Sequence, residues 1–333
     1  MTSASRPSLQ AARLKALVDF QWGATDRERA DYPGGAGLLA GEVAWVLADA
    51  DPLRALGPAL VWAERRDAST VHLLVDDDAE VLARRATCFA PSPVIWLIDG
   101  TTLRRAVAAP PAVLHPAPSS PELAELLVDA DLEVIVEGGI VRGEVRGLEV
   151  ARIVHGSTSA GVPIDEPLLE VGVGHADREL TAMLHGSLSP TDQLARVVEI
   201  VRRHRRIGAE RHPLNQLAPE RWLRSCLVAD PGRLGLTSLA PIAPAVDRRN
   251  LRDSAVAMAR GETAGGASAI VACSVGVDLD LVPAAADTRL AADPEARLLL
   301  VMPERDAHSV TRMLAARLSA PAEVIAIDDD WRC

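Results

Sequence analysis

Two stretches of this chain, residues 43–99 and 268–328, carry the same succession of apolar runs and marker residues. In each stretch, a short apolar run is followed by a Pro-Ala pair, a second apolar run, an Asp-Ala pair and an Ala-Pro pair. A third apolar run then ends on aspartate. The runs are Val43–Leu47, Val71–Val75 and Val94–Asp99 in the first stretch, and Ala269–Ala272, Leu298–Met302 and Val324–Asp328 in the second.

Unbroken apolar runs that alternate with helix-length segments are typical of a parallel sheet whose two faces are both buried. We therefore expect an α/β protein with duplicated Rossmann-like βαβαβ modules flanking a central α+β domain. Asp78 and Asp306 stand where helix N-caps belong. The alternative is convergence, because any two βαβαβ stretches look somewhat alike. Whether the two modules share one sheet is left open.

The region between the modules has a different order of elements. We expect a helix at residues 121–129, a hairpin at 132–154 that turns at Gly138-Gly139, and a strand at 167–173. Helices follow at about 176–186, 191–205 and 219–228. The expected divisions are an N-terminal helical or irregular arm (1–42), the first module (43–115), the central domain (121–228), a linker (229–254) and the second module (255–333).

The composition limits which partners and which cellular compartment we expect for this protein. The net charge of −11 argues against nucleic acid as a bulk partner, although it leaves room for a local basic groove. No apolar run approaches the roughly 20 residues of a membrane span. Cys88, Cys226, Cys273 and Cys333 are far apart and form no C-x-x-C pair, so we expect free thiols of a reducing compartment and a cytoplasmic protein.

The densest basic run is Arg202-Arg203-His204-Arg205-Arg206, and more arginines follow in the next loop and helix. Arginine forks bind phosphate or carboxylate with two hydrogen bonds, and a tryptophan can stack on a base. We expect this region to bind a small anionic or nucleotide-like ligand. The alternative is that cations near a helix C-terminus are favoured by the helix dipole alone. The expected ligand-binding residues are Arg205, Arg206, Asn215, Arg221, Trp222 and Arg224.

Aspartates also gather where the module strands end, for example Asp49, Asp76 and Asp306. Ligands of open α/β sheets bind at that edge, and converging carboxylates could hold Mg²⁺ or an amine. The alternative is that aspartate is simply common in turns and at N-caps.

Glu149 and Glu170 lie on two neighbouring expected strands, after a helix and a hairpin. Over residues 121–205 this arrangement resembles the core of PD-(D/E)xK nucleases. The resemblance implies that Glu149 and Glu170 are catalytic and hold Mg²⁺, which activates water. The lysine of that motif is replaced by Gly172. The alternative makes Glu133, Glu137, Glu144 and Glu149 the solvent face of an amphipathic hairpin.

Three function classes therefore remain. The first is a protein that binds a small anionic or nucleotide-like ligand through its arginine-rich loop. The second is a metal-dependent nuclease-like enzyme or a degenerate relative, and the third is a non-catalytic structural or partner-binding protein. Catalysis, substrate and oligomeric state are not readable from the residues.

Overall fold

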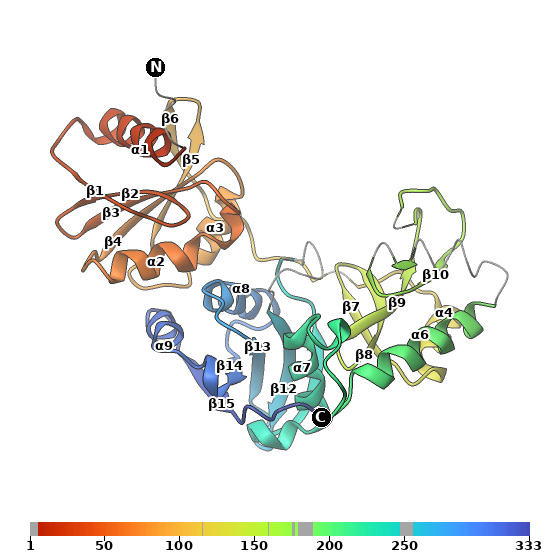
Figure 1. Cartoon of the computed structure of the whole chain (residues 1–333). Helices are drawn as coiled ribbons and strands as arrows, with labels where there is room; N and C mark the ends of the chain where they lie inside the picture. Colours follow the sequence, from red (N-terminus) through yellow and green to blue (C-terminus); the bar gives the residue numbers. More distant parts are fainter. Residues whose placement is uncertain (1–5, 115, 159, 175–176, 179–188, 247–255) are drawn as a thin grey trace. The chain divides into compact units, whose positions relative to one another are not determined.

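The computed structural model describes residues 6–333 except 115, 159, 175–176, 179–188 and 247–255 (Figure 1). It is a mixed α/β protein with three sheets. The chain divides into two compact units. The first comprises Met1–Pro111, Asp278–Leu290 and Ala307–Val324, and the second comprises Ala112–Val277, Ala291–Asp306 and Ile325–Cys333.

The first sheet has six strands whose spatial order follows the chain. Its middle strands β3, β4 and β5 are parallel, as the apolar runs predict, and the outer strands are antiparallel to their neighbours. Helices α2 (Leu56–Glu64) and α3 (Ala79–Ala86) connect the parallel strands. The strands are β1 (Glu28–Ala30), β2 (Gly35–Ala40), β3 (Val43–Ala48), β4 (Thr70–Val75), β5 (Val94–Asp99) and β6 (Thr102–Arg105).

The expected arm at 1–42 is wrong for its described part, because residues 6–42 supply a helix and two strands of this layer. Helix α1 (Arg6–Trp22) packs Leu14 and Val18 against Trp45, Leu47 and Leu74 of the sheet (Figure 1). Strand β2 pairs with β3 over its whole length. Its sequence, Gly-Ala-Gly-Leu-Leu-Ala, has low strand propensity, so the register with β3 rather than local preference makes it a strand.

The central sheet is antiparallel, in the order β10-β9-β8-β7. The Gly138-Gly139 hairpin turn is confirmed, with both glycines at positive φ. The apolar face of the sheet packs on α4 (Pro121–Asp129) and α6 (Pro190–His204), and the Ser189 side chain caps α6 by accepting a hydrogen bond from the Asp192 amide. The expected helix at 176–186 falls largely outside the described residues. The strands are β7 (Glu133–Glu137), β8 (Ile140–Val145), β9 (Leu148–Val154) and β10 (Leu168–Val171).

The third sheet has the order β11-β12-β13-β14-β15, and β13 and β14 are parallel. Residues 229–254, expected as a linker, contain β11, which pairs with β12. Helix α7 (Pro219–Ala229), expected in the central domain, buries Trp222 and Leu223 in the core of this sheet. The strands are β11 (Leu236–Ile242), β12 (Ala257–Thr263), β13 (Ser268–Cys273), β14 (Arg297–Pro303) and β15 (Ala322–Ile327).

The first unit also contains most of α8 (Leu281–Ala292) and all of α9 (Ser309–Ala316). A Cβ atom on Gly57 of α2 would lie 1.8 Å from the Leu279 carbonyl oxygen, so only glycine permits this approach. Arg84 of α3 forms a two-pronged ion pair with buried Asp287 of α8, at 2.7 and 3.0 Å. Backbone and side-chain contacts therefore both fix α8 within this unit.

The expected helix caps are only partly right. Asp78 occupies the N-cap of α3, but its side chain forms no capping hydrogen bond there. Asp306 precedes α9 without capping it, since His308 is the N-cap residue. The Asp306 carboxylate instead accepts a hydrogen bond from the Gly276 amide at 2.8 Å. No helix among the described residues is long and apolar enough to cross a membrane.

Candidate functional site

Arg205, the fourth residue of the basic run, is fully buried just beyond the end of α6. Its guanidinium donates hydrogen bonds to the carbonyl oxygens of Arg146, Leu214 and Leu217, at 2.7, 2.9 and 2.7 Å. It also lies over the ring of Trp222, 4.6 Å from the centroid. Burial lowers the pKa of Arg205 to about 10. The side chain thus binds the loop that follows its own helix.

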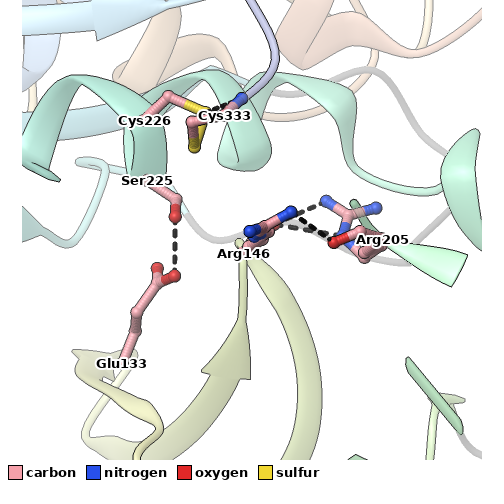
Figure 2. The surroundings of a disulfide bond; sticks show 6 residues. All are labelled: Glu133, Arg146, Arg205, Ser225, Cys226 and Cys333. Atoms are coloured by element: carbon pink, nitrogen blue, oxygen red, sulfur yellow. Dashed lines mark hydrogen bonds between the residues drawn. A yellow bond between two sulfur atoms is a disulfide. The ribbon is translucent and has the colours of Figure 1, made fainter. Parts of the chain in front are cut away.

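Arg221 and Arg224 lie one turn apart on α7 and point at the central hairpin. Arg224 contacts Glu137 at 3.3 Å and Glu144 at 3.0 Å, and Arg221 forms short hydrogen bonds to the same two carboxylates. Burial alone would raise the pKa of Glu137, but the two guanidiniums lower it below its ordinary value. Ser225, one residue further on, donates to Glu133 at 2.6 Å (Figure 2).

These contacts correct the solvent-face interpretation of the hairpin glutamates. Glu137, Glu144 and Glu149 are each at most 4% exposed. Arginines cover the face that carries these glutamates, whereas Val134 and Val136 of β7 are exposed. Two arginines at i and i+3 on α7 were the available signal, because that spacing places both on one helix face.

The fold therefore buries some of the expected ligand-binding residues and leaves others accessible. Arg205, Arg221, Trp222 and Arg224 are buried against protein partners, and Asn215 donates to the Glu210 carbonyl at 3.0 Å. Arg206 is exposed. A ligand-binding role for these residues stays a prediction, and Arg206 is the member with open access to solvent.

Glu149 and Glu170 lie on adjacent strands and both approach Arg178. The Arg178 guanidinium is 3.0 Å from Glu149 and 3.8 Å from Glu170. Arg152 lies 2.9 Å from Glu149, and Arg142 donates a short hydrogen bond to the other oxygen of that carboxylate. Burial would raise the pKa of Glu149, but the surrounding arginines lower it.

This donor set does not fit a divalent cation. Both oxygens of Glu149 already face guanidinium groups, which occupy the place that a metal would need. Within the part of the chain that the structure describes, no cluster of three or more His, Cys, Asp or Glu side chains could hold a metal ion. At Gly172, where the nuclease motif has lysine, φ is +140° and a Cβ atom would lie 2.9 Å from the Arg178 amide nitrogen. No metal-dependent step is therefore derived for Glu149 and Glu170.

A groove of about 910 Å³ lies between α4 and α6, beside the basic run. Figure 1 shows the two helices side by side on the central sheet. The side chains that line the groove without charge are Leu126, Ala130, Thr191, Leu194, Ala195 and Val198. The charged ones are Asp129, Asp131, Glu199, Arg202, Arg203 and Arg206.

Most charges of the groove are paired with one another. Arg202 donates to the Asp131 carboxylate at 3.0 Å, and Arg203 lies 3.1 Å from Glu199. Arg206 donates from Nε to the Arg203 carbonyl oxygen at 3.2 Å. This bond uses one donor of the guanidinium and holds Arg206 at the groove.

The aspartates at the strand ends of the first module are also paired. Asp49 accepts from Arg6 at 3.0 Å, and Asp76 accepts from Arg13 at 2.9 Å. Both arginines lie on α1. Asp49 lines a second cavity, of about 530 Å³, together with Arg6, Arg29 and Tyr32. The edge of the first sheet where these strands end therefore carries arginines as well as carboxylates.

The expectation of four free cysteines is wrong. Cys226 and Cys333 form a disulfide, although 107 residues separate them, whereas Cys88 and Cys273 are free. Spacing along the chain carries no information about such a distant pair. No protein-family model, curated protein or solved structure matches this chain.

Proposed function

We propose that the protein binds a small amphipathic anion in the groove between α4 and α6. The main support is a groove of about 910 Å³ with an apolar floor and arginines on its rim. Small-molecule sites commonly have volumes of roughly 300–1,000 Å³, an apolar lining and a few polar groups that orient the ligand. The size and the lining of this groove both match that class.

The anionic part of the ligand is assigned from the rim. Arg202 and Arg203 each have an acidic partner, whereas the Arg206 contact is to a backbone carbonyl. Asp129 stands on the same rim, so the site selects a single anionic group near Arg206 rather than a polyanion. A carboxylate or phosphate monoester matches the two terminal nitrogens of a guanidinium.

The apolar part of the ligand is assigned from the floor. Leu194 and Val198 are successive members of one α6 stripe, and Leu126 faces them from α4. An alkyl chain or a flat ring laid on this floor would remove apolar surface from water, at roughly 25 cal/mol per Å². The expected anionic ligand is retained, and of the expected binding residues only Arg206 lines this groove.

Isothermal titration calorimetry tests the proposal with decanoate, decyltrimethylammonium and adenosine monophosphate. We expect decanoate to bind, and we expect the double substitution Arg203→Ala and Arg206→Ala to weaken its binding by about tenfold or more, since a charged hydrogen bond contributes about 1.5–3 kcal/mol. Ala195→Trp should also weaken binding by filling the groove. Arg196→Ala, an exposed substitution on the same helix, is the matched control.

Two outcomes would contradict the proposal. Decanoate binding that does not change in the double variant would place the ligand elsewhere. Binding of adenosine monophosphate alone, with the same arginine dependence, would contradict the amphipathic ligand and favour a nucleotide.

We also infer that the flanking modules descend from one duplicated unit. The Ala90 amide donates a hydrogen bond to the Arg317 carbonyl oxygen, and the Ser319 amide donates one to the Cys88 carbonyl oxygen, each at 2.9 Å. If the two Ala-Pro markers are aligned, Cys88 corresponds to Leu318, and Phe89 corresponds to Ser319. Each segment therefore meets its own equivalent, as in an isologous dimer interface. An experimental structure in which β15 ran antiparallel to β14 would contradict the duplication, because β5 is parallel to β4.

A further inference from the structure

The Cys226–Cys333 disulfide joins α7 to residues 328–333 across 107 positions of sequence, with 5.5 Å between the two Cα atoms (Figure 2). Cys226 is 2% exposed, whereas Cys333 is partly exposed. The disulfide thus joins a residue inside the core of the third sheet to one that packs against that core and is partly open to solvent.

The 328–333 segment lies against α7 through aromatic contacts. Trp331 is 1% exposed, and its ring meets that of Trp222 edge-on, with 6.1 Å between the centroids. The Arg332 guanidinium lies 5.4 Å from the Trp222 ring and 4.7 Å from the Trp331 ring. Both tryptophan indole nitrogens are buried and have no hydrogen-bond partner among the described residues, so packing holds the rings together.

Trp222 links this segment to the loop that follows α6. Its ring also faces the guanidinium of Arg205, which binds the carbonyl oxygens of Leu214 and Leu217. The contacts of α7 with the central sheet are made by Arg221, Arg224 and Ser225, not by the disulfide. Breaking the disulfide therefore removes one attachment and leaves those contacts in place.

We infer that the Cys226–Cys333 disulfide is a thiol-controlled latch that holds residues 328–333 over Trp222. A thiolate of a small reductant attacks the sulfur of Cys333, the more exposed residue of the pair, and the S–S bond breaks. The electron pair goes to Cys226, which takes up a proton. A second thiolate then attacks the mixed disulfide and releases the oxidised reductant and the Cys333 thiol. One protein disulfide and two small thiols thus yield two protein thiols and one small disulfide.

The latch is closed in an oxidising compartment and opens in a reducing one. When it is open, the segment is still held by the packing of Trp331, by Arg332 over the two tryptophan rings and by the contact of Asp329 with the Arg305 amide. When the latch is closed, residues 328–333 pack against Trp222 on one side, and the loop after α6 binds Arg205 on the other. The state of one bond therefore controls the exposure of a buried tryptophan pair.

Hydrogen exchange of the whole chain, followed by mass spectrometry, tests the latch in oxidised glutathione and in excess reduced glutathione. Reduction should accelerate exchange at the amides of residues 329–333 by at least about tenfold, while peptides from β3 and β4 stay unchanged. Thiol titration of the unfolded protein should rise from two to four groups, because Cys88 and Cys273 are free in both states. Cys333→Ser should exchange rapidly in both buffers, and Cys88→Ser is the matched control.

Slow exchange in the segment after all four thiols have appeared would overturn the latch. So would four free thiols in protein equilibrated with oxidised glutathione, because the bond would not form. Neither readout depends on a ligand in the α4–α6 groove, so the two proposals fail separately.

Discussion

Two buried ionic clusters, one in each compact unit, use similar groups with different electrostatic results. In the second unit, Arg221 and Arg224 bridge Glu137 and Glu144. In the first unit, adjacent arginines on α3 meet aspartates of the 278–290 segment. The contacts there are Arg84 to Asp287, Arg85 to Asp287 and to Asp280, and Arg54 to Asp278.

The difference lies in how the carboxylates are compensated. Glu137 and Glu144 each contact both guanidiniums, and the pKa of Glu137 is lowered. Asp280 of the first unit is desolvated, and the effect of Arg85 and Arg54 beside it is opposed by the neighbouring Asp278. The pKa of Asp280 is raised to about 7 by burial, against the opposing effect of Arg85. The balance of burial, neighbouring guanidiniums and neighbouring carboxylates therefore sets the direction of each pKa shift.

The largest expected effect comes from breaking the paired cluster. Arg224→Ala leaves Glu137 and Glu144 buried with one guanidinium between them. Removal of one partner from a buried ion pair costs about 3–5 kcal/mol of the free energy of unfolding. Urea denaturation measures this loss. A loss below about 1 kcal/mol would show that water or rearrangement compensates these glutamates, and that burial in this cluster is overstated.

A smaller effect is expected in how the free energy of unfolding depends on pH, which should differ between the two clusters. Burial raises the pKa of Asp280 from an ordinary value of about 3.8 to about 7 in the folded state. The folded state therefore binds the extra proton, and the stability that this group contributes is present below pH 3.8 and is lost as the pH rises through 7. The slope can reach about 1.4 kcal/mol per pH unit between these values.

Asp280→Asn should remove that slope, which urea unfolding at pH 5, 6 and 7 would reveal against the wild-type chain. The groups that face Asp280 are Arg85, Arg54 and Asp278. Glu137 behaves in the opposite sense, since its lowered pKa contributes stability above its unfolded value that is lost on acidification. An unchanged slope in Asp280→Asn would assign the pH dependence to another group.

The smallest effect is expected at the surface. The side chains of Arg203 and Glu199 are 65% and 74% exposed, and they lie 3.1 Å apart on α6. Arg203→Ala should change the free energy of unfolding by no more than about 0.5 kcal/mol, because water and salt screen exposed pairs. A loss comparable to that of Arg224→Ala would contradict the distinction between buried and exposed arginines in this chain.

Much of the local structure was predictable from residue order. Strands β3, β4 and β5 match the predicted runs to within one residue, because two buried faces require unbroken apolar side chains. Helix α4 and the Gly138-Gly139 turn were also predicted, from helix periodicity and turn chemistry. Strand β11 was missed because proline, glycine and polar residues surround a strand that pairing with β12 stabilises.

The candidate sites were predictable only as residue types. Glu149 and Glu170 do share one region of the central sheet, but the arginine that approaches both is Arg178, which follows in a separate segment. Arg205 and Arg206 are neighbours with the same side chain, yet one is buried beneath carbonyl oxygens and the other is exposed. No propensity separates them, because the loop at 213–218 decides which one it covers.

From the amino-acid order alone came the apolar runs, the hairpin, the capped helix at 190–204 and the two-faced central strands. These follow from periodicity and backbone chemistry, which act over a few residues. The partners of the arginines, the Cys226–Cys333 bond and the groove beside Arg206 were decided by tertiary structure. Charge and sulfur chemistry act between atoms a few ångströms apart in space. Folding brings those atoms together from distant positions, 107 residues apart for Cys226 and Cys333 and 224 for Arg54 and Asp278.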